Sequence, residues 1–211
     1  MKFYGQFYPP QDQILYETYF SDSKIGTFLE CGAADGIIDS SCLFFEESLG
    51  WSGINVEAVP FIYKTLMMNR PKSINIFAAL SDKAGEGKFV HAIHPIYGQR
   101  FNNGSLSHAP EHKQDLIQQG CRFQEYLVPL MTYNELVTQT GIRRLDLFVL
   151  DVEGHEISVI DGMRGASVLP RVFCIEFGFL NADVLHSKLA DLGFRKDRIV
   201  HNNVVYLHNE F

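Results

Sequence analysis

Segments typical of β-strands alternate along this chain with segments typical of helices, and this alternation constrains the fold more than any other feature. Strand-like runs occupy residues 26–30, 51–58, 73–80, 125–132, 145–154, 171–178 and 202–209, and residues 87–93 resemble an extended edge segment. Helical patterns occupy residues 40–50, 60–71, 132–141, 155–163 and 182–194. Such alternation predicts βαβ units and a mostly parallel sheet with helices on both faces. With no internal repeat or linker, the 211 residues are predicted to form one α/β domain, 1–211.

Helix-boundary signals support several of these assignments. Ser40 or Ser41 is suited to cap the helix that closes at Gly50. Thr132 and Glu135 have the spacing of a capping box, in which each side chain bonds the other's backbone N–H. We therefore expect helices to begin near residues 41 and 132.

Residues 92–126 interrupt the alternation. This segment is too polar for a core strand and too long for a simple turn. Long excursions of this kind often form lids or binding loops, so the segment is a candidate acceptor-binding loop or lid. The alternative, given equal weight, is a solvated loop with one short helix. In the strand that follows, Pro129 predicts a position at a sheet edge, because proline cannot donate to a ladder.

Charge and composition exclude several classes of function. The formal net charge is −7, which opposes nonspecific binding to nucleic acid or to an anionic membrane. No apolar stretch approaches the ~20 residues of a membrane span, and the first residues lack the apolar region of a signal peptide. The four cysteines are scattered without a CxxC pair. We therefore expect a cytoplasmic protein with reduced thiols.

Acidic residues stand at the ends of four predicted strands. These residues are Glu30, Glu57, Asp151 and Glu176. In open α/β sheets, ligands bind outside the carboxyl ends of the strands, and buried acids need partners. A ligand with hydroxyls and an amine would satisfy them. The alternative is that each acid caps the following helix; several acids at one sheet edge favour a binding site.

The loop after the first strand, Glu-Cys-Gly-Ala-Ala-Asp-Gly, indicates which ligand. It lacks the GxGxxG spacing of a dinucleotide site, and the acid Glu30 would repel a pyrophosphate. Gly32 and Gly36 allow close backbone approach. Glu57 follows Gly36 by 21 residues, where a carboxylate commonly holds a ribose diol, for NAD as for other nucleosides. An acid beside the loop favours a cationic nucleoside, S-adenosylmethionine, over NAD.

Four segments together resemble a known family, the FkbM-type methyltransferases. They are "FLECGAADGIIDSS", "GWSGINVEAVP", "NIFAALSD" and "LFVLDVEGHEISVIDGM". The resemblance implies a Rossmann-like class I methyltransferase fold: a seven-stranded, mostly parallel sheet with helices on both faces and an antiparallel C-terminal strand. It implies S-adenosylmethionine as cofactor and methylation of a hydroxyl, often on a sugar or a natural-product scaffold.

The resemblance also implies roles for individual residues. Glu30, Gly32 and Ala33 would hold the methionine end of the cofactor, and Glu57 with Ala58 the ribose. Residues 79–82, the Ala-Leu-Ser-Asp block, would flank the adenine, with Asp82 or a backbone amide as its hydrogen-bonding partner. Asp151 would approach the methionine moiety. Ser41 would meet the cofactor carboxylate or serve only as a cap. The full predicted cofactor set is Glu30, Gly32, Ala33, Gly36, Ser41, Glu57, Ala58, Ser81, Asp82 and Asp151.

Methyl transfer to an alcohol requires a base or a metal. Asp151, Glu153 and His155 emerge together where the most apolar strand ends. His155 titrates nearest neutrality and is the first candidate, with Asp151 next; a local hydrogen-bonding role for His155 is the alternative. Asp151 and Glu176 could bind Mg²⁺, but no metal site is favoured, because the sequence shows no dense acidic cluster.

The acceptor is the least constrained part of the prediction. Tyr97, Arg100 and Asn103 in the long insertion are candidate substrate-binding residues, with solvated loop positions as the alternative. We expect O-methylation of a sugar, a glycan or a glycosylated metabolite. An amine or carboxylate acceptor, a nicotinamide-dependent dehydrogenase and a noncatalytic adenosine-binding module remain as alternatives. The expected partner is a small-molecule or glycan acceptor rather than nucleic acid, and the sequence does not specify an oligomeric state.

Overall fold

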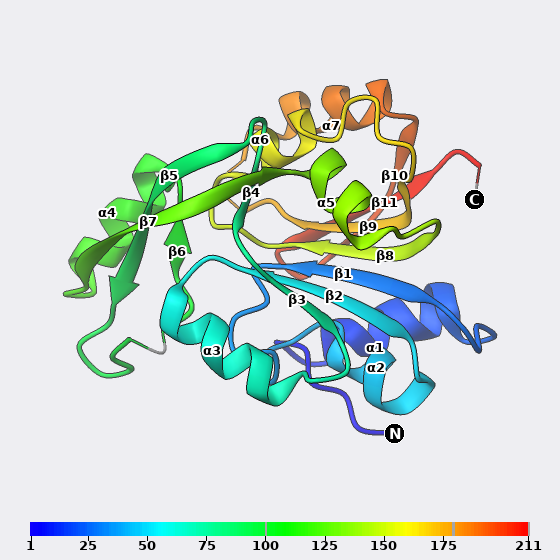
Figure 1. Cartoon of the computed structure of the whole chain (residues 1–211), viewed down its shortest axis with the longest axis horizontal. Coiled ribbons are helices and arrows are strands. Elements are labelled where there is room, and N and C mark those ends of the chain that lie inside the picture. Colours follow the sequence, from blue (N-terminus) through cyan, green and yellow to red (C-terminus); the bar gives the residue numbers. More distant parts are fainter. Residues whose placement is uncertain (100, 179, 211) are drawn as a thin grey trace.

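The computed structural model describes residues 1–99, 101–178 and 180–210. A seven-stranded sheet in the order β10-β11-β9-β8-β1-β2-β3 forms the centre of the molecule (Figure 1). Its strands are β1 (Thr27–Cys31), β2 (Ser52–Glu57), β3 (Ile74–Phe77), β8 (Leu145–Leu150), β9 (Pro170–Glu176), β10 (Phe194–Val200) and β11 (Asn203–His208). Strand β11 runs in the direction opposite to the other six strands of this sheet. The seven-stranded sheet with an antiparallel C-terminal strand is therefore confirmed.

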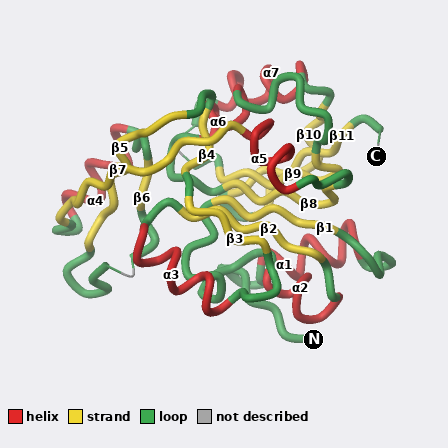
Figure 2. Tube along the Cα trace, in the orientation of Figure 1, coloured by secondary structure: helices red, strands yellow, loops and turns green. Residues whose placement is uncertain are grey.

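Helices cover both faces of this sheet, as the tube in Figure 2 also shows. They are α1 (Gln11–Leu15), the π-helical turn η1 (Tyr16–Phe20), α2 (Leu43–Leu49), α3 (Pro60–Asn69), α5 (Tyr133–Thr140), α6 (Glu156–Asp161) and α7 (Ala182–Asp191). Alternate residues of one strand face opposite cores: Phe28 joins the cluster under α1 and α2, and Leu29 the cluster under α5, α6 and α7. This two-residue period is why the strands read as continuous apolar runs.

A second, four-stranded sheet in the order β4-β7-β5-β6 packs beside the first one. It contains β4 (Ala79–Ser81), β5 (Gly85–Ile93), β6 (Gly104–Ser105) and β7 (Arg122–Thr132), with α4 (Pro110–Gln118) between its last two strands along the chain. The predicted insertion at 92–126 is thus the central part of an ordered subdomain that begins near residue 79. We call residues 79–132 the insertion sheet.

Two predicted strands differ from the observed ones. The run 73–80 is two strands in two different sheets, because the chain leaves the first sheet after β3, at Ala78, whose N–H bonds the Glu57 carbonyl. Strand β10 was missed because its five middle residues are all exposed and four of them are charged, so it has no apolar periodicity. The sheet-edge position predicted from Pro129 was wrong, because β7 pairs with β4 on one side and with β5 on the other. Pro129 lies one residue before the pairing with β4 begins at Leu130. The missing N–H of Pro129 therefore leaves no gap in that ladder.

Local boundary signals are mostly confirmed. The capping box of Thr132 and Glu135 is present, and Gly50 ends α2 in the left-handed conformation. Helix α2 begins at Leu43, and Ser40 Oγ accepts the Leu43 N–H at 3.1 Å although the N-cap position belongs to Cys42. Within the described residues, no helix is both long and apolar enough to cross a membrane.

Candidate active site

A cavity of ≈ 930 Å³ lies between the carboxyl ends of the central strands and the insertion sheet. All four strand-end acids, Glu30, Glu57, Asp151 and Glu176, line it. Ligand pockets typically occupy about 300–1,000 Å³, so this cavity has room for a nucleoside cofactor together with a second small molecule. The carboxyl edge of the sheet is thus a concave site, as its acids predicted.

The first loop of this site requires glycine at position 32. Gly32 has φ +84°, and a Cβ there would stand 1.8 Å from the Asp151 carbonyl oxygen. The neighbouring Asp151 N–H donates to the Cys31 carbonyl at 3.0 Å. The loop after β1 and the loop after β8 are therefore in direct backbone contact, and only a residue without a side chain fits between them.

Glu57 ends β2 with both carboxylate oxygens bonded to backbone. It accepts from the Ala34 N–H at 3.0 Å and from the Val59 N–H at 2.6 Å. Burial raises its pKa to about 7, against the opposing effect of these backbone bonds. Each carboxylate oxygen has two lone-pair sites, so Glu57 retains capacity for a ligand's hydroxyls.

Glu30 is held by the protein itself. Its carboxylate accepts from the Ser40 hydroxyl and the Ser41 N–H, both at 2.7 Å, and lies 3.7 Å from Nη1 of Arg70. Burial raises the pKa of Glu30, and the Arg70 charge opposes that rise. The expectation that Glu30 needs a cationic ligand is therefore weakened, because a protein cation already lies beside it.

Arg70 is the main residue that the sequence analysis missed in this region. It is fully buried at the end of α3, where Nη1 donates to the Gly36 carbonyl at 3.0 Å and Nη2 lies 2.9 Å from Glu46. The only sequence signal for it was the need of a buried Glu30 for a counter-charge. Arg70 ties the cofactor loop, α2 and Glu30 together.

Three predicted cofactor residues do not line the cavity. A Cβ at Gly36 would meet Arg70 and Leu66 at 2.6 Å, so its glycine serves packing against α3. Ser81 donates to Asp82 at 3.0 Å and lies the same distance from Nε2 of His155. Of the predicted adenine block, the first half, Ala79 and Leu80, lines the cavity, together with the preceding Ala78. The other predicted cofactor residues, Glu30, Gly32, Ala33, Ser41, Glu57, Ala58 and Asp151, do line it.

His155 lines the cavity but has both ring nitrogens engaged. Nε2 lies 3.0 Å from the Ser81 hydroxyl and Nδ1 lies 2.8 Å from the Ser107 hydroxyl. Burial lowers its pKa, against the opposing influence of Asp82. The geometry therefore matches the local hydrogen-bonding role, and it places His155 as a link between the insertion sheet and the loop after β8.

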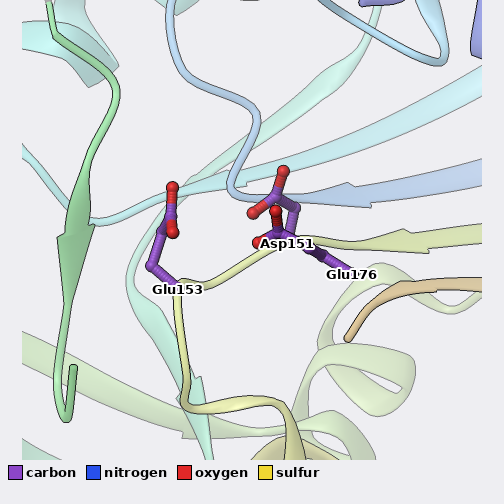
Figure 3. A group of neighbouring side chains, drawn as sticks. All are labelled: Asp151, Glu153 and Glu176. Carbon is purple, nitrogen blue, oxygen red and sulfur yellow. The ribbon is translucent and has the colours of Figure 1, made fainter. Parts of the chain in front are cut away.

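Asp151, Glu153 and Glu176 form a carboxyl cluster that the sequence did not reveal (Figure 3). One oxygen from each lies within 4.8 Å of the others. Burial raises the pKa of all three, and the Asp151 charge further raises the pKa of Glu153 and of Glu176. Three oxygen ligands are also the type that Mg²⁺ binds, so this cluster is where the chain could hold a hard cation. The expectation of no dense acidic cluster was wrong, because Glu176 comes from a neighbouring strand.

The predicted acceptor residues fall on the insertion side. Tyr97 and Asn103 line the cavity, while Arg100 lies outside the described residues. The rings of Tyr97 and Phe101 are nearly parallel, 14° apart, with centroids separated by 6.1 Å. The insertion sheet thus supplies an aromatic wall opposite the strand ends.

The domain model for methyltransferase FkbM domains matches residues 30–196. The chain belongs to the FkbM methyltransferase family. The match covers every strand-end acid and the whole insertion sheet. Comparison with curated proteins finds no match.

Solved structures agree with this family in fold. The METTL16 MTase domain matches with a TM-score of 0.54 at 8% identity, over 96% of this chain and 67% of that one. A TehB-like SAM-dependent methyltransferase from Corynebacterium glutamicum matches with a TM-score of 0.47 at 11% identity, over 94% of this chain and 87% of that one. The family match and the likeness to the METTL16 MTase domain together show that the chain has the fold of class I S-adenosylmethionine-dependent methyltransferases.

Several cavity residues of this FkbM methyltransferase escaped prediction. Gln6 and Phe7 reach the cavity from the N-terminal segment, before the matched residues. Phe89 and His91 come from β5, and Asp115 from α4. The N-terminal and insertion segments lack strand–helix alternation, so no strand register could be predicted that would bring these side chains to the strand ends.

Proposed function

We propose that this chain transfers a methyl group from S-adenosylmethionine to a hydroxyl of a sugar, a glycan or a glycosylated metabolite. One observation supports the proposal: the cavity has two chemically different walls, which meet at the carboxyl cluster of Asp151, Glu153 and Glu176. One wall is the loop and strand ends that a nucleoside cofactor requires. The other is an aromatic and polar wall with space for an acceptor.

The residues of the first wall fit this cofactor. Glu57 has lone pairs available for the ribose hydroxyls, and the side chains of Ala58, Val59 and Ala79 line an apolar part of the cavity suited to adenine. The backbone of Gly32 and Ala33 lines the cavity beside Asp151. When bound, S-adenosylmethionine supplies an electrophilic methyl group on a sulfonium.

Asp151 is the proposed base. A proton on Glu176 lets that carboxyl donate to Asp151, and this hydrogen bond lowers the pKa of Asp151 while burial raises it. Asp151 then remains the ionised member of the cluster, with a basicity above that of an exposed aspartate. It can accept the proton of an acceptor hydroxyl. Asn202 donates to Glu176 at 2.6 Å and fixes the orientation of that carboxyl.

His155 becomes a positioning residue in this proposal. With hydroxyls at both ring nitrogens and a lowered pKa, it has no nitrogen available for an acceptor without losing a bond. Its contacts hold the loop that contains Asp151 and Glu153. The insertion sheet above this loop excludes water from the reacting atoms, which methyl transfer requires.

Product mass spectrometry tests the proposal. The chain is incubated with S-adenosylmethionine and a panel of neutral, amino and acidic glycans, and S-adenosylhomocysteine binding is measured by calorimetry. We expect binding, a methylated glycan and release of S-adenosylhomocysteine. Binding without any methylated product would favour the noncatalytic module, methylation of an amine nitrogen or of a carboxylate would identify the other acceptor classes, and binding of NAD alone would contradict the proposal.

A further inference from the structure

Asp82, one of the groups predicted to bind the adenine, does not line the cavity, and its carboxylate accepts from the Ser81 hydroxyl at 3.0 Å. Ala79 and Leu80, which do line it, bring apolar side chains that cannot accept a hydrogen bond. The exocyclic amine of an adenine is a donor and is costly to bury without an acceptor. An adenine held in this part of the cavity therefore needs its hydrogen-bonding partner from another element.

His91 on β5 has a buried ring nitrogen without a partner. The residue is 1% exposed, and its Nε2 lies 2.9 Å from the Gln99 carbonyl oxygen. Because a carbonyl oxygen only accepts, Nε2 carries the proton. Burial lowers the pKa of His91, against the opposing effect of the bond to Gln99, so the ring is neutral and Nδ1 is an acceptor. His91 lines the cavity, yet Nδ1 has no hydrogen-bond partner within the described residues.

The imidazole of His91 is fixed before any ligand binds. Its bond to Gln99 holds one side of the ring, and the Phe61 ring meets it edge-on, at 72° with centroids 5.8 Å apart. Strands pair with the His91 backbone on both sides. A Cβ at Gly104 would stand 2.4 Å from the Phe89 ring and 3.4 Å from Nδ1 of His91, so glycine at this position leaves Nδ1 uncovered. A fixed, unpaired acceptor on a cavity wall indicates a ligand with a donor.

The side chains beside His91 suit a flat apolar ring. Phe89 lies two residues earlier on β5, so both side chains project from the same face of the strand, roughly 7 Å apart. Phe89 belongs to one buried cluster with Ala58, Val59 and Ala79, and all four line the cavity. A purine that packs on this cluster is long enough to bring its outer edge to His91. The complement of this surface is therefore a flat ring with an N–H donor at one edge.

We propose that Nδ1 of His91 accepts a hydrogen bond from the exocyclic amine of the cofactor's adenine. The base lies where the two walls of the cavity meet, between the residues that follow β2 and strand β5 of the insertion sheet. This inference rests on the proposed function, and it assigns the choice of nucleobase to the insertion sheet. It excludes hypoxanthine and guanine, because their carbonyl at the same ring position would face a second acceptor.

Three matched probes test the nucleobase preference. S-adenosylhomocysteine, its purine analogue and its hypoxanthine analogue differ at ring position 6, which bears an amine, a hydrogen or a carbonyl. Calorimetry measures the Kd of each without turnover. We expect loss of the amine to weaken binding about 5-fold, because one hydrogen bond is lost, and the carbonyl to weaken it about 100-fold, because two acceptors are then buried face to face.

Two substitutions separate the roles of the two ring nitrogens. The amide nitrogen of a glutamine can occupy the place of Nε2, whereas the amide oxygen of an asparagine can occupy the place of Nδ1. His91→Gln therefore keeps the donation to the Gln99 carbonyl and should reduce the preference for the amine over the carbonyl about 10-fold or more. His91→Asn keeps an acceptor at the Nδ1 position and should retain most of the preference.

A second histidine of the same segment provides the control. Nδ1 of His94 accepts from the Ile96 N–H at 3.1 Å, and His94 does not line the cavity. His94→Asn, which keeps a short acceptor for this turn, should leave the Kd of all three probes unchanged. In ¹⁵N-histidine NMR spectra of the wild type, S-adenosylhomocysteine should shift the Nδ1 signal of His91 toward that of a protonated nitrogen, and the purine analogue should not.

The outcomes separate this inference from the proposed function. If S-adenosylhomocysteine binds but the three probes bind equally, or if His91→Gln leaves their ranking unchanged, the inference is wrong and the methyltransferase proposal stands. If no nucleoside probe binds, the proposed function fails and the inference fails with it. Tighter binding of the hypoxanthine analogue would show that Nδ1 donates rather than accepts, which would also overturn the inference.

Discussion

The two walls of the cavity differ in how their polar groups are satisfied. On the sheet side, Glu30 and Glu57 accept hydrogen bonds from the chain itself. On the insertion side, Nδ1 of His91 and Oδ1 of Asn103 have no partner within the described residues. The first wall is therefore formed before any ligand arrives, and the second is completed by one. A preformed wall suits a cofactor used in every turnover, because its binding requires little reorganisation.

The largest effect on kcat is expected at Asp151, which lies where the two walls of the cavity meet. Asp151→Asn removes the proposed base while keeping the size of the side chain, so kcat should fall about 10²- to 10⁴-fold. Glu153→Gln should lower kcat less, because the Glu153 carboxyl already faces Nδ1 of His112 at 3.3 Å and is not the proposed base. Steady-state kinetics of both variants make the comparison. A larger fall in kcat for Glu153→Gln would exchange the two roles.

The next largest effect is expected from removing the buried cation that supports the sheet-side wall of the cavity. Arg70→Met leaves Glu30 and Glu46 without their buried cation and should destabilise the protein by about 3–5 kcal/mol, measured by urea unfolding. Arg144 provides the control, since its side chain is exposed and pairs with Asp146 near the amino end of β8. Arg144→Met should cost less than about 1 kcal/mol. Equal losses would show that Arg70 has no special role in this wall.

Glu57 gives a smaller effect with a pH signature. Glu57→Gln should weaken S-adenosylhomocysteine binding about 10- to 100-fold, because a charged acceptor to the ribose is lost. Since the pKa of Glu57 is raised to about 7, ligand affinity should rise as the pH increases through 7, and the variant should lose this dependence. Calorimetry across this range measures both.

The same residue affects stability in the opposite direction. In the free protein, folded Glu57 binds its proton more tightly than the unfolded chain does. Its contribution to the free energy of unfolding is therefore full below the ordinary glutamate pKa of about 4.5 and is lost as the pH rises through 7. A flat contribution in a wild-type minus Glu57→Gln comparison would place the pKa of Glu57 at its ordinary value.

The smallest effect is expected where the two walls are joined. His155→Gln can retain one of the two serine hydrogen bonds, so kcat should fall only a few-fold. Ser107→Ala removes only the bond at Nδ1 of His155 and should have a similar effect. A loss of about 10²-fold or more for His155→Gln, with Ser107→Ala near the wild type, would restore His155 as the base.

The sequence predicted the sheet and the acids at its edge because strand ends in a parallel sheet have fixed positions. Once Phe28 and Leu29 are assigned to opposite faces, Glu30 must stand at the carboxyl end. The carboxyl cluster escaped because Glu176 is 23 residues from Glu153 in the chain, and only the adjacency of β8 and β9 brings them together. Arg70 was also missed because its partner Glu30 lies far from it in the chain and only the fold brings the two side chains together. The insertion sheet could not be placed because strands β5 and β7 pair with each other, independently of the repeating βαβ pattern.

The serine contacts below the insertion sheet have a consequence for exchanging acceptor modules between relatives. The Ser105 hydroxyl donates to the Val152 carbonyl at 2.9 Å, Ser107 bonds His155, and a Cβ on Gly154 would collide with the Ser107 carbonyl and the Ala109 N–H at 2.9 Å. A transplanted insertion must therefore bring two hydroxyls, two residues apart, to the loop after β8. A chimera that keeps Ser105 and Ser107 should preserve the geometry around Asp151. The residues of the insertion sheet that do not contact the loop after β8 can then vary.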